Sequence, residues 1–121
     1  MMRLKFVCFD FKKQKSNIIY FDNSFFDRYL EYCEKNHLPF LVEDLVSFYF
    51  VENGWVVDRI YLQRVYGLDL KITKDNVVRY IEVKSRFDAI KLNQLEFIFG
   101  HENCEVIWVL EDETDLRDLM Y

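Results

Sequence analysis

Two strand-like runs, residues 68–74 and 77–86, meet at the pair Asp75-Asn76. Asp and Asn both tolerate left-handed backbone geometry, so the pattern predicts a tight β-hairpin. If the turn lies at these two residues, the numbers of facing residues add up to 151, and Asp69 is expected to face Glu82. This register constrains the fold more tightly than any other feature of the sequence.

The expected facing of Asp69 and Glu82 is unfavourable unless something positive lies between them. The Cβ atoms of opposite residues are about 5 Å apart, and like charges so placed repel by about 3 kcal/mol at an effective dielectric of about 20. Mg²⁺, which prefers one or two carboxylates together with water and phosphate, is the natural candidate, with Mn²⁺ as a substitute. The two His and three Cys residues are wrongly placed for a softer metal.

Lys84 lies two residues after Glu82 and therefore on the same face of the predicted strand, whereas Ile81 and Val83 lie on the other face. Its compact positive charge suits a group that holds an attacking water and balances negative charge on phosphorus. Asp69, Glu82 and Lys84 together predict a metal-dependent phosphodiester hydrolase. The alternative is that Asp69 is a surface acid near the turn and that Glu82 and Lys84 lie on a solvent-facing strand edge.

The segments "GLDL" and "IEVKSR", thirteen residues apart, resemble the PD-(D/E)XK nuclease superfamily. In that superfamily an aspartate and an E-x-K triplet lie on adjacent strands of a mixed sheet flanked by helices. The resemblance implies an α+β, restriction endonuclease-like fold and a Mg²⁺-dependent DNA endonuclease. It also implies a metal site at Asp69, Glu82 and Val83 with Lys84 at the water, although Leu68 replaces the proline that often precedes the aspartate.

The resemblance covers about residues 40–110 and implies a role for Glu43. A helix is predicted after Pro39, and Glu43 stands eleven residues before Gly54, which ends it. Many members of the superfamily carry a glutamate at this spacing as an auxiliary metal or water ligand. The alternative is an exposed acid that the helix dipole favours.

The segment "IKLNQLEFI" resembles the one that follows E-x-K in archaeal Holliday junction resolvases and small restriction-type nuclease domains. Resolvases usually have glutamine three residues after the helix cap. Here, with Asn93 as the cap, that residue is Glu96, and the pair is also an ordinary capping box. Gln94, in the first turn, is a candidate for contact with nucleic acid or with the residues around the site.

The charge of the chain is uneven. Residues 59–91 contain eight basic and four acidic residues, a local charge of +4, and the rest of the chain carries −9. One basic surface on an acidic protein suits a nucleic acid partner, and the resemblance implies that this partner is DNA. Arg64, Arg86 and Lys91 flank the site in sequence and are predicted to contact phosphates. Tyr61, Tyr66 and Tyr80 suit stacking on unpaired bases, with ordinary packing as the alternative.

The chain of 121 residues, with one Pro and three scattered Gly, is expected to form a single domain. Residues 1–37 predict an N-terminal β-hairpin followed by a helix that Asn23 or Ser24 caps, and residues 111–121 predict an acidic tail or short helix. The sequence has no apolar run of membrane-spanning length and no signal peptide, so a cytoplasmic location is expected. Cys8, Cys33 and Cys104 are interpreted as buried hydrophobic residues, with one disulfide as the alternative.

Two other functions remain open for such a sequence. The first is a catalytically inactive nuclease-fold module that binds nucleic acid or protein in a repair, replication or defence assembly. The second is a protein-interaction domain, including an acidic inhibitor of nucleic-acid enzymes, which the charge of −9 outside the basic segment suggests. The abundant aromatic residues favour a homodimer, which would suit cleavage of paired strands.

Overall fold

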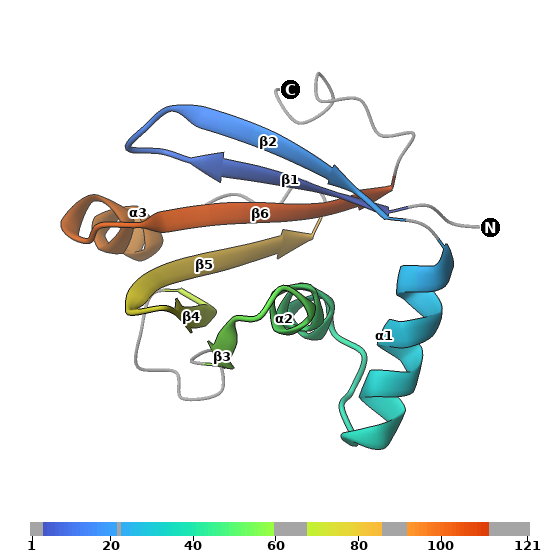
Figure 1. Ribbon diagram of the computed structural model, residues 1–121. Helices are drawn as coiled ribbons and strands as arrows, with labels where there is room; N and C mark the ends of the chain where they lie inside the picture. The colour runs from blue at the N-terminus through green and yellow to red at the C-terminus, as the bar shows by residue number, and fades with distance from the viewer. Residues whose placement is uncertain (1–3, 22, 60–67, 86–91, 112–121) are drawn as a thin grey trace.

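The computed structural model describes residues 4–21, 23–59, 68–85 and 92–111. These residues form one mixed sheet of six strands, in the order β2-β1-β6-β5-β4-β3, and three helices (Figure 1). The strands are β1 (Leu4–Asp10), β2 (Lys15–Tyr20), β3 (Val56–Asp58), β4 (Leu70–Lys74), β5 (Val77–Ser85) and β6 (Cys104–Glu111). The helices are α1 (Asn23–Lys35), α2 (Val42–Glu52) and α3 (Leu92–Gly100). The expected α+β class is confirmed.

The β4–β5 hairpin has the register that the sequence predicts. Its pairs run from Leu70 opposite Ile81 to Lys74 opposite Val77. The turn residues Asp75 and Asn76 have φ angles of 50° and 66°, the left-handed values that a two-residue turn between twisted strands requires. Because side chains alternate along β5, this register decides which residues face the core and which face the candidate site.

The N-terminal hairpin is part of the central sheet. Strand β1 pairs antiparallel with both β2 and β6, and β6 pairs in parallel with β5. The parallel pair is joined through α3, as a parallel connection requires a crossover segment. The hairpin predicted at the N-terminus is therefore correct, but it extends the sheet beyond β6 and buries Phe6 and Val7 on opposite faces of β1.

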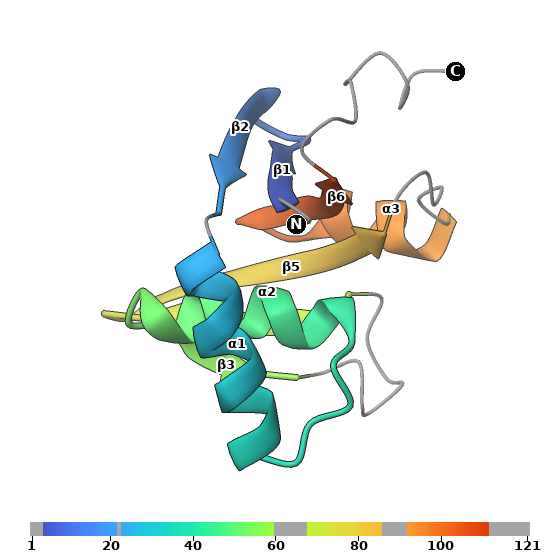
Figure 2. The same cartoon turned by 90° about the vertical axis from the view of Figure 1, so that its right-hand side faces the viewer.

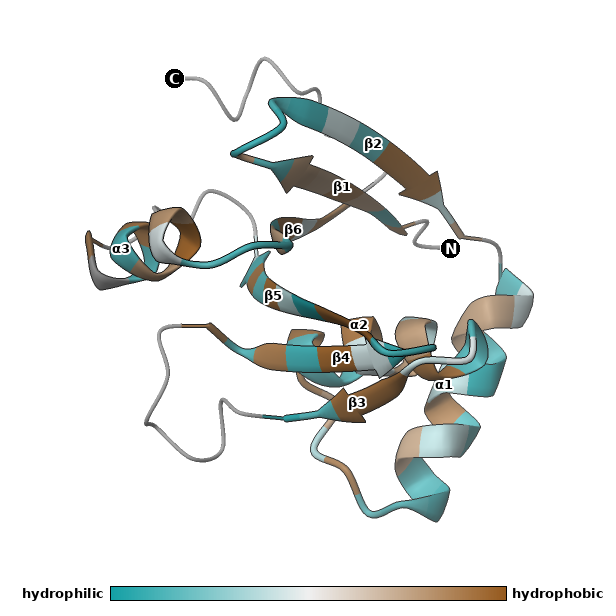
Figure 3. Cartoon of the chain, turned by 60° about the vertical axis from the view of Figure 1, so that its left-hand side comes forward, coloured by the Kyte–Doolittle hydropathy of each residue, from teal (hydrophilic) through white to brown (hydrophobic). Residues whose placement is uncertain are grey.

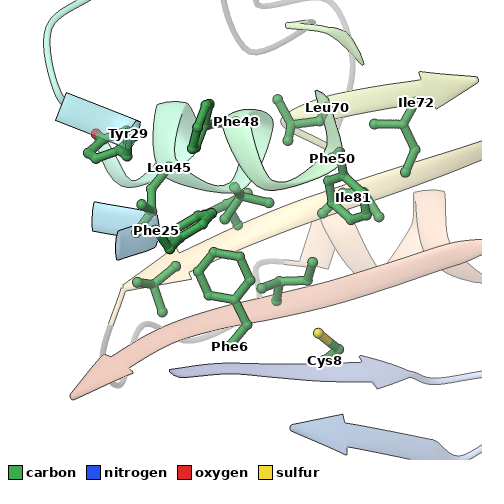
Figure 4. Close-up of a cluster of buried hydrophobic side chains, with 14 of the residues drawn as sticks. Phe6, Cys8, Phe25, Tyr29, Leu45, Phe48, Phe50, Leu70, Ile72 and Ile81 are labelled. Carbon is green, nitrogen blue, oxygen red and sulfur yellow. The ribbon is translucent and has the colours of Figure 1, made fainter. Parts of the chain in front are cut away.

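The helices cover the sheet from both sides (Figure 2). Helices α1 and α2 pack on one face, where Phe25 and Phe50 belong to one buried cluster with Phe6, Ile72 and Ile81 from the strands (Figure 4). Phe48 of α2 packs against Phe25 of α1 and so joins the two helices. A smaller cluster on the face that carries α3 is formed by Leu68, Ile98, Cys104 and Val106. Side chains at odd positions of β5, such as Ile81, thus belong to the larger core, and those at even positions point toward α3.

The ends of α2 show how local sequence positions this helix. The side chain of Asp44 accepts a hydrogen bond from the main-chain N–H of Leu41 at 3.0 Å, which holds the first turn. Gly54, with a φ of 86°, follows the last turn, as the sequence predicts. Helix α2 therefore begins beside the acidic residues that are described below.

The remaining predictions concern the cysteines, membrane-spanning segments and the C-terminal residues. Cys8, Cys33 and Cys104 are all buried and free, which confirms their interpretation as small hydrophobic residues. Strand β2 is hydrophilic near the hairpin tip and hydrophobic toward its end (Figure 3). In the part of the chain that the structure describes, no helix is long and apolar enough to cross a membrane. The predicted acidic helix at residues 111–121 lies almost entirely outside the described residues.

Candidate active site

Asp69 lies immediately before β4, and its side chain takes the place of the next main-chain hydrogen bond between the two strands of the hairpin. Its main-chain N–H donates to the carbonyl of Ile81 at 3.1 Å, and its carboxylate accepts from the N–H of Val83 at 2.8 Å. Because β4 begins only at Leu70, no strand residue pairs with Val83 on this side. The carboxylate satisfies the otherwise unpaired donor, and this bond fixes the side chain of Asp69 at the end of the hairpin ladder.

Glu82 is buried beside Asp69. It is 3% exposed, and its Oε2 has no hydrogen-bond partner among the described residues. The pKa of Glu82 is raised from 4.5 to about 9, first because burial disfavours the charged form, and then by a hydrogen bond to Asp69 and by the charge of Asp69. The prediction that the hairpin brings these two carboxyl groups together is confirmed.

Lys84 is buried on the same face of β5 as Glu82. It is 7% exposed, and its Nζ lies 4.0 Å from Oε1 of Glu82. The same Nζ donates a hydrogen bond of 3.1 Å to Oε1 of Gln94, in the first turn of α3. A buried ammonium needs such partners, because its charge is costly away from water. Gln94 thus positions the amine, whereas its predicted contact with nucleic acid stays a prediction.

Glu43 lies in the first turn of α2 and is half-buried. Its pKa is raised, mainly by burial and further by the charges of Asp69 and Asp44, and its own charge contributes to the raised pKa of Glu82. Helix α2 therefore brings Glu43 into electrostatic contact with the Asp69–Glu82 pair, as the spacing to Gly54 implied. These four residues, Glu43, Asp69, Glu82 and Lys84, are called the acidic site below.

The acidic site is not a group of three converging ligands. Within the described ranges, no three His, Cys, Asp or Glu side chains lie close enough together to hold one metal ion. Direct coordination by Glu43 together with Asp69 and Glu82 is therefore absent from this arrangement. Glu43 comes from α2, which packs on the face of the sheet opposite to α3, whereas Asp69 and Glu82 come from the two sides of one hairpin and Glu82 points toward α3.

Two carboxylates and a main-chain oxygen nevertheless fit a hard cation. In a strand the N–H and C=O of one residue point toward the same neighbour, so the carbonyl of Val83 lies on the side where its N–H meets Asp69. Among the described residues Oε2 of Glu82 has no hydrogen-bond partner, and the pKa of Glu82 is raised to about 9, and both observations indicate missing positive charge. Mg²⁺ uses one or two carboxylates and fills its other positions with water and phosphate, so the donors suit it.

Sequence reasoning missed the role of Asp44, the neighbour of Glu43. Asp44 is fully buried and forms an ion pair with Arg59, whose Nε lies 3.8 Å from its Oδ1. With its bond to Leu41, this pair anchors the turn that carries Glu43. The signal was available, since an acid three residues after a helix cap is a capping residue.

The predicted phosphate-binding residues Arg64, Arg86 and Lys91 lie outside the described residues, as do Tyr61 and Tyr66. Glu96 is exposed on α3. Because α3 begins at Leu92, Asn93 lies inside the helix, and the prediction that Asn93 caps it in a capping box with Glu96 is wrong. Comparison of the chain with protein-family models, with curated proteins and with solved structures finds no match. The case for a function therefore depends on the geometry of the acidic site.

Proposed function

We propose that this chain is a Mg²⁺-dependent DNA endonuclease of the PD-(D/E)XK type. The observation that carries the proposal is the contact of the half-buried carboxylate of Asp69 with the buried carboxyl group of Glu82. Among the described residues, Oε2 of Glu82 has no hydrogen-bond partner, and the ammonium of Lys84 lies 4.0 Å from its Oε1. A buried acid in contact with a second acid is costly without a cation, so an arrangement of this kind is unfavourable as a purely structural element.

Each residue has a distinct part in the proposed reaction. Asp69, Glu82 and the carbonyl of Val83 would hold Mg²⁺, or Mn²⁺ in its place. When bound, such an ion lowers the pKa of water and stabilises negative charge on phosphate oxygens. Lys84 holds the attacking water and balances the charge that develops on phosphorus, and Gln94 orients its ammonium. Glu43 increases the negative potential that attracts the cation.

A second candidate function is a nuclease-fold module that binds nucleic acid or protein without cleaving DNA. It is favoured by one observation, the lack of a third converging carboxylate within the described part of the chain. In that case Asp69 would be retained for the hydrogen bond that its carboxylate accepts from Val83. A homodimer that presents two sites to paired strands stays a prediction under either function.

Cleavage assays separate these possibilities. The purified chain is incubated with labelled duplex, single-stranded, flap and four-way junction DNA in the presence of Mg²⁺ or Mn²⁺. We expect cleavage that EDTA stops and that Asp69→Asn and Lys84→Met each abolish. Glu31→Gln, which changes an exposed acid on α1, is the matched control and should be fully active. Activity that survives both site substitutions would contradict the mechanism, whereas metal-independent binding without cleavage would favour the inactive module.

A further inference from the structure

A hollow of about 490 Å³ lies on the face of the sheet that carries α3. It is bounded by the turn and first residues of β5, by β4 and by the segment that joins α3 to β6. Its polar and aromatic lining residues are Lys71, Asn76, Tyr80, His101, Glu102 and Asn103. The carboxylate of Glu102 is paired with the ammonium of Lys12 at 3.2 Å. A volume of this size is within the range of ligand sites in proteins.

Three aromatic rings pack together at the hollow. Tyr80 and His101 line it, and Phe97 lies behind them. The rings of Phe97 and His101 are parallel, with centroids 3.8 Å apart and planes 9° apart. Tyr80 packs edge-on against both, at 5.1 Å from Phe97 and 5.7 Å from His101. His101 is exposed, and its Nδ1 lies 2.9 Å from the carbonyl of Phe97, which fixes the orientation of the imidazole. The exposed ring is therefore held rigidly before any ligand arrives.

Polar groups surround these rings. Lys71 lies directly across from Tyr80 in the β4–β5 ladder and supplies a cation on the same face. The amides of Asn76 and Asn103 line the hollow, and Asn103 is held by the bond that its Nδ2 donates to the carbonyl of Val78 at 3.3 Å. An aromatic platform, amides and an ammonium are the groups that stack on a nucleobase, hydrogen-bond to its edge and neutralise its phosphate.

The hollow lies next to the acidic site on the same strand. Tyr80 precedes Glu82 by two residues, so both side chains point to the face that carries α3, about 7 Å apart along β5. Lys84 follows Glu82 by two residues and lies on the same face of β5. A DNA strand that presents a phosphate to Glu82 and Lys84 therefore has a neighbouring nucleotide within reach of Tyr80 and His101.

We propose that this hollow binds an unpaired nucleotide next to the phosphate that is cleaved, so that the substrate class is DNA with a single-stranded segment at the cut. This inference depends on the proposed nuclease function. A base that stacks on His101 has to leave its base pair, which costs free energy in continuous duplex and costs little in an overhang, flap or gap. The hollow thus favours substrates whose bases are already unpaired.

The test measures binding and cleavage separately. Binding of fluorescently labelled oligothymidine and of a duplex of equal length is followed by anisotropy in EDTA, where no cleavage occurs. We expect His101→Ala to weaken binding of the single strand about fivefold or more, with little effect on duplex. His37→Ala, at the other histidine of the chain, is the matched control and should leave both affinities unchanged. Tyr80→Phe keeps the ring and is expected to bind like the wild type.

The outcomes distinguish the two proposals. Equal affinity for single strand and duplex, or a His101→Ala variant that binds the single strand as tightly as wild type, overturns this inference even if Asp69-dependent cleavage is observed. Loss of single-strand affinity in His101→Ala together with a flap or overhang preference that the same variant abolishes supports it. Single-strand binding that depends on His101 but is never followed by cleavage in Mg²⁺ or Mn²⁺ overturns the nuclease function alone.

Discussion

The carboxylate of Asp69 accepts a hydrogen bond of 2.8 Å from the main-chain N–H of Val83, the residue between Glu82 and Lys84. One side chain thus completes the end of the hairpin ladder and contributes half of the acidic pair. Its structural role needs only an oxygen acceptor, whereas its role toward a cation needs the negative charge. Substitutions that differ in these two properties separate the roles.

We predict that Asp69→Asn keeps the fold and loses cleavage, because the amide oxygen still accepts from Val83 but the charge is gone. Asp69→Ala should also lower the free energy of unfolding by about 1–3 kcal/mol, since a buried N–H loses its partner. Urea unfolding and DNA cleavage, measured on both variants, check this. Equal stability of the two variants would show that the bond to Val83 contributes little.

The raised pKa of Glu82 predicts how stability depends on pH. Its pKa of about 9 in the folded protein exceeds the ordinary 4.5, so the folded state binds the proton more tightly. The stabilisation of the folded state by the proton on Glu82 is fully present below about pH 4.5 and is lost as the pH rises toward 9. Glu43 and Glu105 have raised pKa values and act in the same direction. The difference between wild type and Glu82→Gln, followed by thermal unfolding from pH 5 to 9 without metal, isolates Glu82.

The affinity for a metal ion should rise with pH, whereas the stabilisation by the proton on Glu82 decreases with pH. Because a cation requires the ionised carboxylate of Glu82, its binding releases a proton, and the affinity should rise by up to about tenfold per pH unit below pH 9. Calorimetric titration of Mn²⁺ in buffers of different ionisation enthalpy measures both the affinity and the released proton. Binding that is unchanged between pH 6 and 8 would place the cation away from Glu82.

Lys84→Met should abolish cleavage while the protein stays folded, since the thioether retains most of the buried stem but not the charge. Removal of the ammonium also leaves Glu82 without the one charge that lowers its pKa, so the carboxyl group should titrate at still higher pH. Lys35→Met, at an exposed position of α1, serves as the control. Gln94→Leu is expected to reduce cleavage less than Lys84→Met, because it alters the orientation of the amine and not its presence.

Asp44 provides a prediction about stability. Asp44→Ala removes the acceptor for the N–H of Leu41 and the partner of Arg59 from a fully buried position. We expect a loss of about 1–3 kcal/mol in the free energy of unfolding, because the N–H of Leu41 loses its acceptor and the partly exposed guanidinium of Arg59 loses its ion pair. Asp27→Asn, an exposed acid on α1, should change stability by less than about 0.5 kcal/mol in the same urea titration.

The hairpin and its acidic pair could be predicted because local signals determine them. Asp75 and Asn76 specify a two-residue turn, the turn specifies the register, and the register brings Glu82 to the end of β4 beside Asp69. The apolar run through Phe6 and Val7 was consistent with a strand that is buried on both faces, which β1 is.

Other features depend on contacts between distant parts of the chain and could not be derived in this way. No local pattern states that β1 pairs with β6, or that β6 runs parallel to β5. The spacing of Glu43 from Gly54 indicated its proximity to the site but not its distance, because the approach of α2 to the sheet depends on the packing of Leu45 and Phe50 in the core that the helix shares with the strands. The hollow beside Tyr80 likewise needs α3 in place.

Strand β5 alternates between the aromatic core, through Ile81 and Val83, and the acidic site, through Glu82 and Lys84. A slip of one residue against β4 would bring both charged groups into the aromatic core and would place Ile81 and Val83 beside Asp69 and Gln94. Such a register is unfavourable, because the charged groups would lose their polar partners. Formation of the correct hairpin therefore also brings the carboxyl groups and the amine beside one another.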